Sequence, residues 1–266
     1  MTLIDTHCHL DFNAYDGLRD EIIAEAAAGG VTRIINPGTD LERSRAAILL
    51  AETYPGVYAA AGVHPNSTAE FSAAHLDALR DLAAHPKVVA IGEIGLDYYW
   101  DDSPKDAQWT AFEAQLGLAA VLELPVIIHN RDASDDVLAV LAAWTAMLPA
   151  ALRDRPGVLH SFSAPQSAAE RGLALGFYLG FTGPVTFKNA DDLCHIAARV
   201  PADRLLVETD GPFLTPHPYR GRRPNRPAYV RFIAERLAAL RAVPYDDFAT
   251  QTTANAARLF ARLGQA

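Results

Sequence analysis

Short apolar runs alternate along the chain with longer segments whose apolar residues follow helical spacing. The runs are rich in Val, Ile, Leu and Ala, which predicts buried strands at residues 3–9, 32–36, 57–63, 88–94, 126–129, 158–161, 177–181 and 205–208. Helical spacing marks residues 17–28, 41–53, 73–84, 105–122, 134–144, 164–174 and 191–200. Strands that alternate with helices in this way predict an α/β fold, a parallel (β/α)8 TIM barrel, formed by a single domain over residues 1–266.

A doubly wound open sheet is the main alternative to the barrel. That fold would carry a glycine-rich phosphate-binding turn directly after the first strand. The segment His7-Cys8-His9 occupies this place instead. Because the chain also shows no linker, low-complexity tract or solenoid repeat, we favour the barrel.

Most of the apolar runs end in a residue type that binds divalent metals. In a barrel the C-terminal ends of the strands form the active-site face, and the eighth strand neighbours the first. Burial of several carboxylates at one place is tolerated only where cations or other partners share the site. We therefore expect six side chains to converge, namely His7, His9, Glu93, His129, His160 and Asp210.

The two cysteines provide no disulfide framework. In a strand that contains both histidines, His7 and His9 point to one face and Cys8 to the other. Cys8 is therefore expected to pack as a small apolar group behind the metal-binding face. With only Cys8 and Cys194 in the chain, a reducing compartment is the default.

Four imidazoles and two carboxylates exceed what one catalytic zinc ion requires. The surplus predicts two divalent ions, Mg, Mn or Zn, with Glu93 as the bridge because each of its two oxygens can bind one ion. Two such ions about 3.5 to 4 Å apart stabilise both the attacking and the leaving oxygen of a phosphoryl displacement. The pattern therefore predicts hydrolysis of phosphate esters.

The net charge of −9 excludes a general attraction to nucleic acid, so any attraction must be local. Arg220, Arg222 and Arg223 follow the eighth run, and with Arg226 and Arg231 they are expected to surround the mouth of the site and bind phosphates. The alternative is a solvated loop that pairs with nearby carboxylates. Without a membrane-spanning apolar stretch or a signal peptide, we expect a cytoplasmic protein.

Six motifs resemble those of a known family, the TatD-type metal-dependent deoxyribonucleases of the amidohydrolase superfamily. The resemblance spans nearly the whole chain, and the order of the motifs makes it specific. The motifs are Asp5-Thr6-His7-Cys8-His9-Leu10, Gly62-Val63-His64-Pro65, Gly92-Glu93-Ile94-Gly95-Leu96-Asp97-Tyr98, the strand at 125–129, Leu159-His160-Ser161-Phe162 and Glu208-Thr209-Asp210-Gly211-Pro212.

The resemblance implies a divalent-metal hydrolase that cleaves phosphodiester bonds in DNA, as a 3′-to-5′ exonuclease on single strands or frayed ends. It also implies that Asp210 orients or deprotonates the attacking water. For His64 it implies a contact with a substrate phosphate, and a purely structural histidine is the alternative. On the family pattern one ion is held by His7, His9, Glu93 and Asp210, and the second by Glu93, His129 and His160.

The sequence leaves several points open. Asn66 stands where many family members carry a second histidine, and Arg226 stands where an acidic residue is common. The same site is also compatible with amide or ester hydrolysis, such as deacylation of D-aminoacyl-tRNA, or with a non-catalytic metal-stabilised scaffold. Asp97, Tyr98 and Tyr99 either order their loop or stack on a base, and Trp100 lies near the mouth.

Overall fold

A sheet of eight parallel strands forms the centre of the computed structural model, which describes residues 2–264. Each strand pairs with the next along the chain, in the order β1-β2-β3-β4-β5-β6-β7-β8. The (β/α)8 barrel expected from the sequence is therefore confirmed. The strands are β1 (Leu3–Asp5), β2 (Val31–Pro37), β3 (Val57–Ala61), β4 (Val88–Asp97), β5 (Val126–Arg131), β6 (Gly157–Leu159), β7 (Tyr178–Phe181) and β8 (Leu205–Val207).

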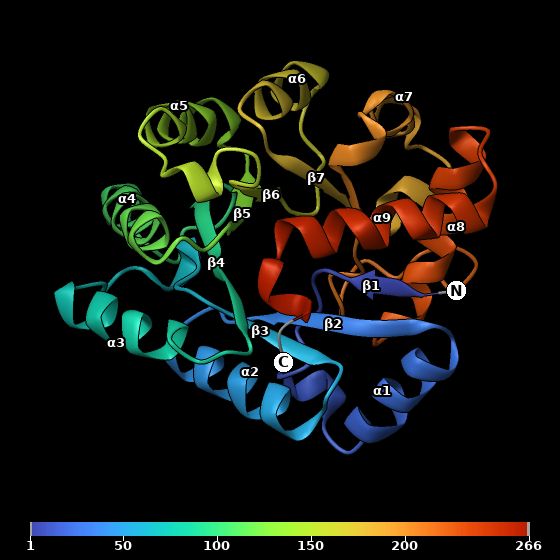
Figure 1. Ribbon diagram of the computed structural model, residues 1–266, viewed down its shortest axis with the longest axis horizontal. Helices are drawn as coiled ribbons and strands as arrows, with labels where there is room; N and C mark the ends of the chain where they lie inside the picture. Colours follow the sequence, from blue (N-terminus) through green and yellow to red (C-terminus); the bar gives the residue numbers. More distant parts are fainter. Residues whose placement is uncertain (1, 265–266) are drawn as a thin grey trace.

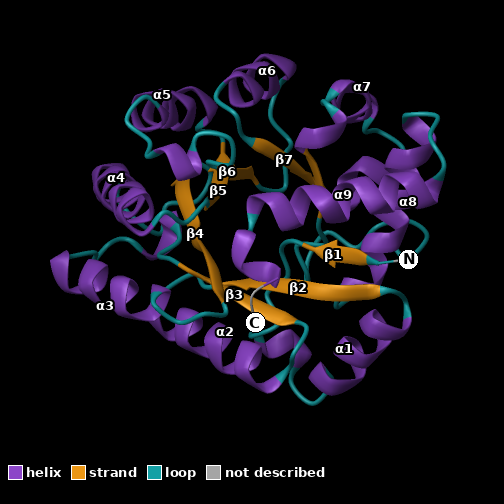
Figure 2. Cartoon of the chain, in the orientation of Figure 1, coloured by secondary structure: helices purple, strands orange, loops and turns teal. Residues whose placement is uncertain are grey.

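Helices surround the sheet and cover its outer face (Figure 2). Their apolar stripes pack against the strands, which buries residues such as Phe112 and Leu116 of α4. Across residues 2–264, none of these helices is long and apolar enough to cross a membrane. The helices are α1 (Arg19–Ala28), α2 (Leu41–Thr53), α3 (Ala73–Ala83), α4 (Lys105–Leu122), α5 (Ser134–Thr145), α6 (Gln166–Ala174), α7 (Asp191–Arg199), α8 (Val230–Leu240) and α9 (Tyr245–Leu259).

Irregular backbone joins the first strand to the last. The amide of Thr6 donates to the carbonyl oxygen of Val207 (3.3 Å), and the amide of Asp210 donates to the carbonyl oxygen of His7 (2.8 Å). These bonds place the segment after β8 beside the segment after β1. Residues that lie about 200 positions apart in the sequence thus reach the same site.

The first strand is shorter than the sequence predicted. It ends at Asp5 and does not extend to His9, because the segment beyond it bonds to neighbours on both sides: the amide of Cys8 donates to Ile35, and that of His9 to Gly211. The side chains of His7 and His9 nevertheless point the same way. Cys8 is fully buried, as expected for an apolar packing group.

The fourth strand is longer than predicted and continues to Asp97. Its pairing with β5 is irregular between Ile91 and Ile94, so Glu93 lies at a break in the regular ladder. Gly95 has a φ of +149°, and a Cβ atom there would collide with the carbonyl oxygen of His129. Only glycine allows β4 to pass this close to β5 beside that histidine.

Apolar side chains fill the interior of the barrel at the N-terminal ends of its strands. The helix α9, which the sequence analysis did not name, and the following turn lie across this end (Figure 1) and contribute Leu259, Phe260 and Leu263. The interior is thereby closed at one end. The strand residues in this cluster are Ile4, Ile35, Tyr58, Ala60, Val89, Ala90, Ile127, Val158, Tyr178 and Leu206.

Replacement of Phe260 by Ala tests this closure. The side chain is fully buried, so we expect its loss to lower the free energy of unfolding by ~3 to 5 kcal/mol. Chemical denaturation measures the change. Met147→Ala serves as the control, since Met147 is 79% exposed and should change stability by less than ~0.5 kcal/mol. Equal stability of the two variants would show that α9 does not seal the barrel.

Candidate metal centre

Four donor atoms from three segments of the chain gather at the open end of the barrel. The Nε2 atoms of His7 and His9 lie 3.2 Å apart, and they lie 3.4 and 3.6 Å from Oε2 of Glu93. Oδ1 of Asp210 lies 3.8 Å from the first nitrogen and 3.7 Å from the second. These atoms form the first donor group.

Within the first donor group, the spacing of His7, His9 and Glu93 fits a divalent ion, and Asp210 belongs to a neighbouring group of possible ligands with His7 and His160. Four ligands with metal bonds of about 2.0 to 2.2 Å in a tetrahedral arrangement lie ~3.3 to 3.6 Å from one another. Burial lowers the pKa of His9 to about 3, with the neighbouring His7 acting in the same direction, so its imidazole is neutral at pH 7 and offers a lone pair. Burial raises the pKa of Asp210 to about 6, against the influence of His160 and His7.

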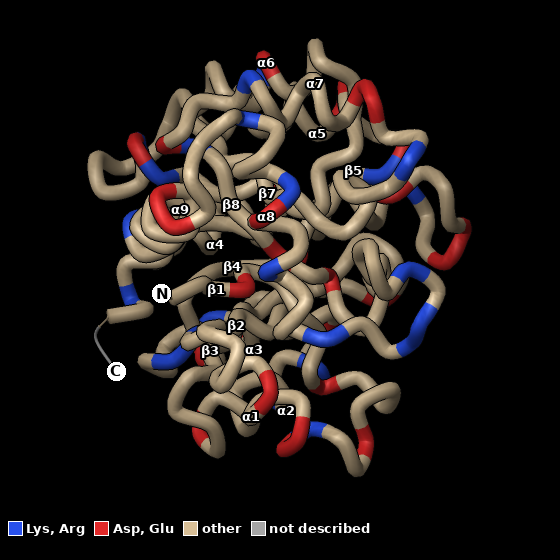
Figure 3. The backbone as a smooth tube through the Cα atoms, turned by 90° about the vertical axis from the view of Figure 1, so that its right-hand side faces the viewer, with Lys and Arg blue, Asp and Glu red and all other residues tan. Residues whose placement is uncertain are grey.

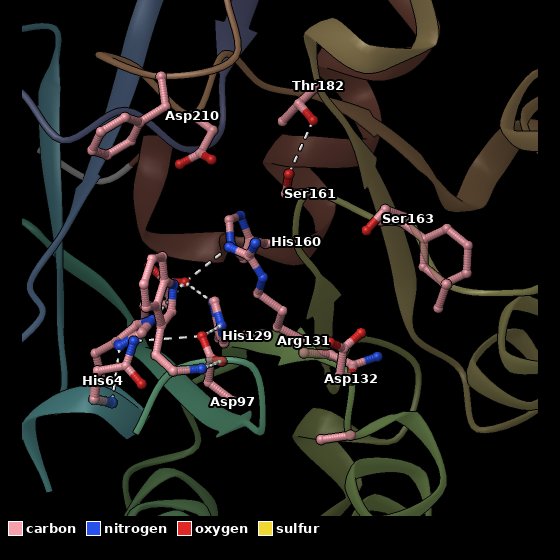
Figure 4. Close-up of a pocket in the computed structure, with 18 of the residues that line it drawn as sticks. His64, Asp97, His129, Arg131, Asp132, His160, Ser161, Ser163, Thr182 and Asp210 are labelled. Atoms are coloured by element: carbon pink, nitrogen blue, oxygen red, sulfur yellow. Dashed lines mark hydrogen bonds and ion pairs between the residues drawn. The ribbon is translucent and has the colours of Figure 1, made fainter. Parts of the chain in front are cut away.

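A second donor group faces the other oxygen of Glu93. Oε1 lies 2.7 Å from Nδ1 of His129, 3.0 Å from Nε2 of His160 and 3.5 Å from Nε2 of His64 (Figure 4). Glu93 is only 3% exposed. One buried carboxylate therefore has each of its oxygens directed at a different set of imidazoles, which is the arrangement expected of a bridging ligand.

The charges around Glu93 keep it ionised. Burial acts to raise the pKa of this carboxyl, but His160, His64 and His7 overcome that effect and hold it well below its usual range. Burial likewise acts to lower the pKa of His160, yet Glu93 and Glu208 raise it well above the ordinary histidine value. An ionised carboxylate is the form that binds cations.

Asp97 holds His129 in place. Its Oδ2 lies 2.9 Å from Nε2 of His129, while its Oδ1 accepts hydrogen bonds from the backbone amides of Tyr99 (3.0 Å) and Trp100 (3.1 Å). Burial acts to raise the pKa of Asp97, but the hydrogen bond to His129 and the other contacts lower it to about 2. Asp97 therefore orders its loop, which is one of the two roles that the sequence analysis left open. It also contacts His129, which the sequence analysis did not foresee.

Glu208 supports His160 from behind. This fully buried carboxylate lies 3.5 Å from Nδ1 of His160 and accepts hydrogen bonds from the amide of Ser161 and the hydroxyl of Thr6. Sequence analysis noted Glu208 at the end of an apolar run and gave it no role. The sequence did contain a signal for such a role. Glu208 ends the predicted buried strand at 205–208, and a buried carboxylate requires partners of its own.

His64 lies next to the candidate metal ligands, with its Nε2 atom 3.5 Å from Oε1 of Glu93. Its Nδ1 accepts a hydrogen bond from the amide of Asn66 (3.2 Å), which directs Nε2 towards Glu93. His64, Glu93 and His129 form one of the clusters whose ligand atoms can surround a cation. Asn66 itself donates to Oδ2 of Asp97 (3.4 Å), so this departure from the family pattern contacts the carboxylate that holds His129.

The three arginines predicted to bind substrate lie in different surroundings. Arg223 lines the pocket that contains the candidate metal ligands. The guanidinium of Arg222 lies 5.0 Å from the ring centre of Tyr219, and that of Arg220 lies 3.9 Å from the ring centre of Phe187. Arg220 lines a separate, adjoining hollow. The structure therefore brings only Arg223 of this group to the site.

The other two arginines of that segment pair with carboxylates. Arg226 lies 2.6 Å from Glu25 and 3.0 Å from Glu21, and Arg231 lies 2.7 Å from Glu235. Arg226 and Arg231 therefore follow the second alternative from the sequence analysis, in which the arginines pair with nearby carboxylates. Basic and acidic positions are interspersed along the visible backbone (Figure 3), so local groups must provide any attraction for an anion.

The donor groups lie at the bottom of a pocket of about 1290 Å³. Its walls carry aromatic, hydroxyl and charged side chains that come from the loops after the strands. They include Phe12, Trp100, Arg131, Ser161, Ser163, Phe213 and Arg223. A pocket of this size admits a substrate considerably larger than a single phosphate group.

Comparison with known proteins identifies the family of this chain. The model of the family described as TatD related DNase matches residues 4–261. The chain belongs to this family. It is 45% identical over 258 residues to the "Uncharacterized metal-dependent hydrolase YabD" of Bacillus subtilis, covering 97% of this chain and 98% of that protein.

Two further relatives agree with this assignment. A Klebsiella pneumoniae protein named "3'-5' ssDNA/RNA exonuclease TatD" is 38% identical over 262 residues, with 97% of each chain covered. The crystal structure of the TatD homologue YjjV from Escherichia coli has a TM-score of 0.89 at 36% identity, and the match covers 97% of this chain and 98% of that one. The protein is therefore a metal-dependent hydrolase of the TatD family with a TIM barrel.

Replacement of Gly180 by Ala tests the support that Glu208 gives to His160. A Cβ atom at residue 180 would lie 2.5 to 2.6 Å from the carboxylate of Glu208 and force that carboxylate to shift from its present position. We expect the affinity for Mn²⁺ to fall about 10- to 100-fold, the usual effect of losing a group that orients a ligand. Isothermal titration calorimetry measures this affinity.

Gly117→Ala is the matched control, because nothing lies within 4 Å of a Cβ atom at that position of α4. Thermal unfolding of both variants shows whether the barrel stays intact. A folded Gly180→Ala protein with wild-type affinity for Mn²⁺ would mean that Glu208 does not position a ligand.

Proposed function

We propose that the protein is a two-metal phosphodiesterase that removes nucleotides from single-stranded DNA or from frayed ends, in the 3′-to-5′ direction. The observation that carries the proposal is that the two oxygens of Glu93 face different pairs of histidines. Oε2 faces His7 and His9, and Oε1 faces His129 and His160. One ion would be held by His7, His9, Glu93 and Asp210, and the other by Glu93, His129 and His160, with His64 adjacent to the second. Divalent ions bound here would lower the pKa of water and neutralise charge on the phosphate.

The residues of the chain supply the remaining parts of the reaction. Asp210 is placed to orient the attacking water and to accept its proton, because its carboxylate borders the open pocket and is 16% exposed. Arg223 lines the same pocket and would bind a phosphate of the strand through its guanidinium. Phe12 stacks on His9 at a distance of 4.6 Å between ring centres and limits the access of water to that ligand.

The name of the Klebsiella relative supports a nucleic acid substrate, and it includes both single-stranded DNA and RNA. The alternative of amide or ester hydrolysis, including deacylation of D-aminoacyl-tRNA, would use the same ions. Relatives that hydrolyse small cyclic amides commonly bridge their metals with a modified lysine, whereas no lysine among residues 2–264 lines this pocket and Glu93 would be the bridge. This difference favours phosphate chemistry.

Glu93→Ala tests the bridging role. Removal of the shared carboxylate deprives both ions of a ligand, so we expect hydrolysis of end-labelled single-stranded DNA to fall at least about a thousandfold while the barrel stays folded. Glu113→Ala is the control, since Glu113 is an exposed carboxylate on α4. Supplying a carboxylic ester and a D-aminoacyl-RNA in parallel identifies the bond that the intact protein cleaves. Wild-type DNA cleavage by the Glu93→Ala protein would refute the bridge.

Arg223→Ala tests the phosphate contact. We expect weaker binding of a phosphorothioate oligonucleotide and a logarithmic salt slope that is smaller by about 0.7, the value for one lost contact to a single strand. The control is Arg231→Ala, because Arg231 pairs with Glu235 on α8. Fluorescence anisotropy across a salt series provides both quantities. An unchanged slope for Arg223→Ala would remove this residue from the binding surface.

A further inference from the structure

Two exposed aromatic rings and one arginine form a cluster beside the second donor group. Tyr99 is 55% exposed and Trp100 is 51% exposed, and their ring centres lie 4.8 Å apart in an edge-to-face arrangement. The guanidinium of Arg131, at the end of β5, lies 3.9 Å from the ring centre of Tyr99 and 5.7 Å from that of Trp100. We call Tyr99, Trp100 and Arg131 the Trp100 platform.

The Trp100 platform is fixed to the metal centre by a single side chain. Asp97 accepts hydrogen bonds from the amides of Tyr99 and Trp100 with one oxygen and contacts His129 with the other. Asp97 is itself 1% exposed, and its own amide donates to Oε1 of Gln108 (2.9 Å). The exposed rings are therefore held by a buried support, and their position is coupled to that of a candidate metal ligand.

About half of the surface of Tyr99 and of Trp100 stays exposed to water. A buried tryptophan side chain removes a large apolar area from water, and leaving half of it exposed forgoes much of that stabilisation. Trp100 nevertheless lines the same pocket as Glu93, His129 and Asp210. An ordered, exposed aromatic surface at the wall of a catalytic pocket is suited to a flat ligand that covers it.

Arg131 adds a positive charge that lies over the rings of Tyr99 and Trp100. Its side chain makes no hydrogen bond or ion pair with any other residue in the part of the chain that the structure describes, and it extends into the pocket (Figure 4). A guanidinium that lies over an aromatic ring keeps its N–H edge free to donate. Arg131 thus presents donors beside a stacking surface, and a phosphate next to a base matches this combination.

We propose that the Trp100 platform binds one nucleotide of a single-stranded nucleic acid next to the phosphate that is cleaved. The base stacks on the ring of Trp100, and the edge of Arg131 donates to the phosphate of the same nucleotide. This assignment rests on the proposed phosphodiesterase function and deepens it. It also provides a physical reason for acting on single strands and frayed ends, since in a duplex the faces of the bases are covered by their neighbours.

Three proteins test the assignment: wild type, Trp100→Ala and Trp100→Phe. Each is loaded with Mn²⁺ and titrated with a short single-stranded phosphorothioate oligonucleotide, either intact or with an abasic unit at each position in turn. We expect Trp100→Ala to bind the intact strand about 5- to 100-fold more weakly, the range for one lost base–aromatic stack, and Trp100→Phe to retain most of the affinity.

The abasic strands separate stacking from a general loss of structure. One abasic position should weaken binding to the wild type by a similar factor and leave binding to Trp100→Ala unchanged, because the stack is already missing there. Met147→Ala, an exposed apolar residue elsewhere, should bind both strands as the wild type does. Quenching of tryptophan fluorescence by the intact strand should disappear in Trp100→Ala.

Two results would overturn the assignment. The first is that an abasic unit, at whichever position it is placed, lowers the affinity of the oligonucleotide by the same factor for the wild type and for Trp100→Ala. The second is a wild-type dimer that the Trp100→Ala change dissociates, which would make the Trp100 platform a protein interface. Hydrolysis of bis(p-nitrophenyl) phosphate by the metal-loaded wild type tests the phosphodiesterase function separately, since that substrate has no nucleobase.

Discussion

The candidate site is organised around one buried carboxylate, Glu93, which faces two groups of imidazoles at once. Burying an ionised carboxylate without partners costs several kcal/mol, and Glu93 is nearly inaccessible to water. Histidines at or after the ends of four strands, β1, β3, β5 and β6, offset this cost. In the proposed function, the same arrangement would hold a pair of cations between these groups, with Glu93 shared by both.

The two ends of the barrel have different tasks. At the N-terminal ends of the strands, α9 and the turn after it fill the interior with apolar side chains. At the other end the strands give way to irregular backbone, and the pocket there is lined by Asp97 and Arg131 at the ends of β4 and β5 and by Trp100 in the loop after β4. This separation allows the mouth to keep exposed rings and unpaired charge without loss of the fold.

The sequence predicted the barrel because its strands are buried on both faces and its helices are amphipathic, and both patterns are local. It also grouped His7, His9, Glu93, His129, His160 and Asp210, because a barrel brings the ends of its strands together. What it could not predict depends on three-dimensional proximity: the early end of β1, the carboxylates of Glu208 and Asp97 behind two histidines, and the pairing of Arg226 with Glu25. Arginines adjacent in sequence face different neighbours, which periodicity does not encode.

Anomalous diffraction from crystals soaked in manganese is the most direct test of the bridging role of Glu93. Two peaks about 3.5 to 4 Å apart, one on the side of Oε2 with His7 and His9 and one on the side of Oε1 with His129 and His160, are the expected result. A single peak at full occupancy, or two peaks that do not share Glu93, would contradict it.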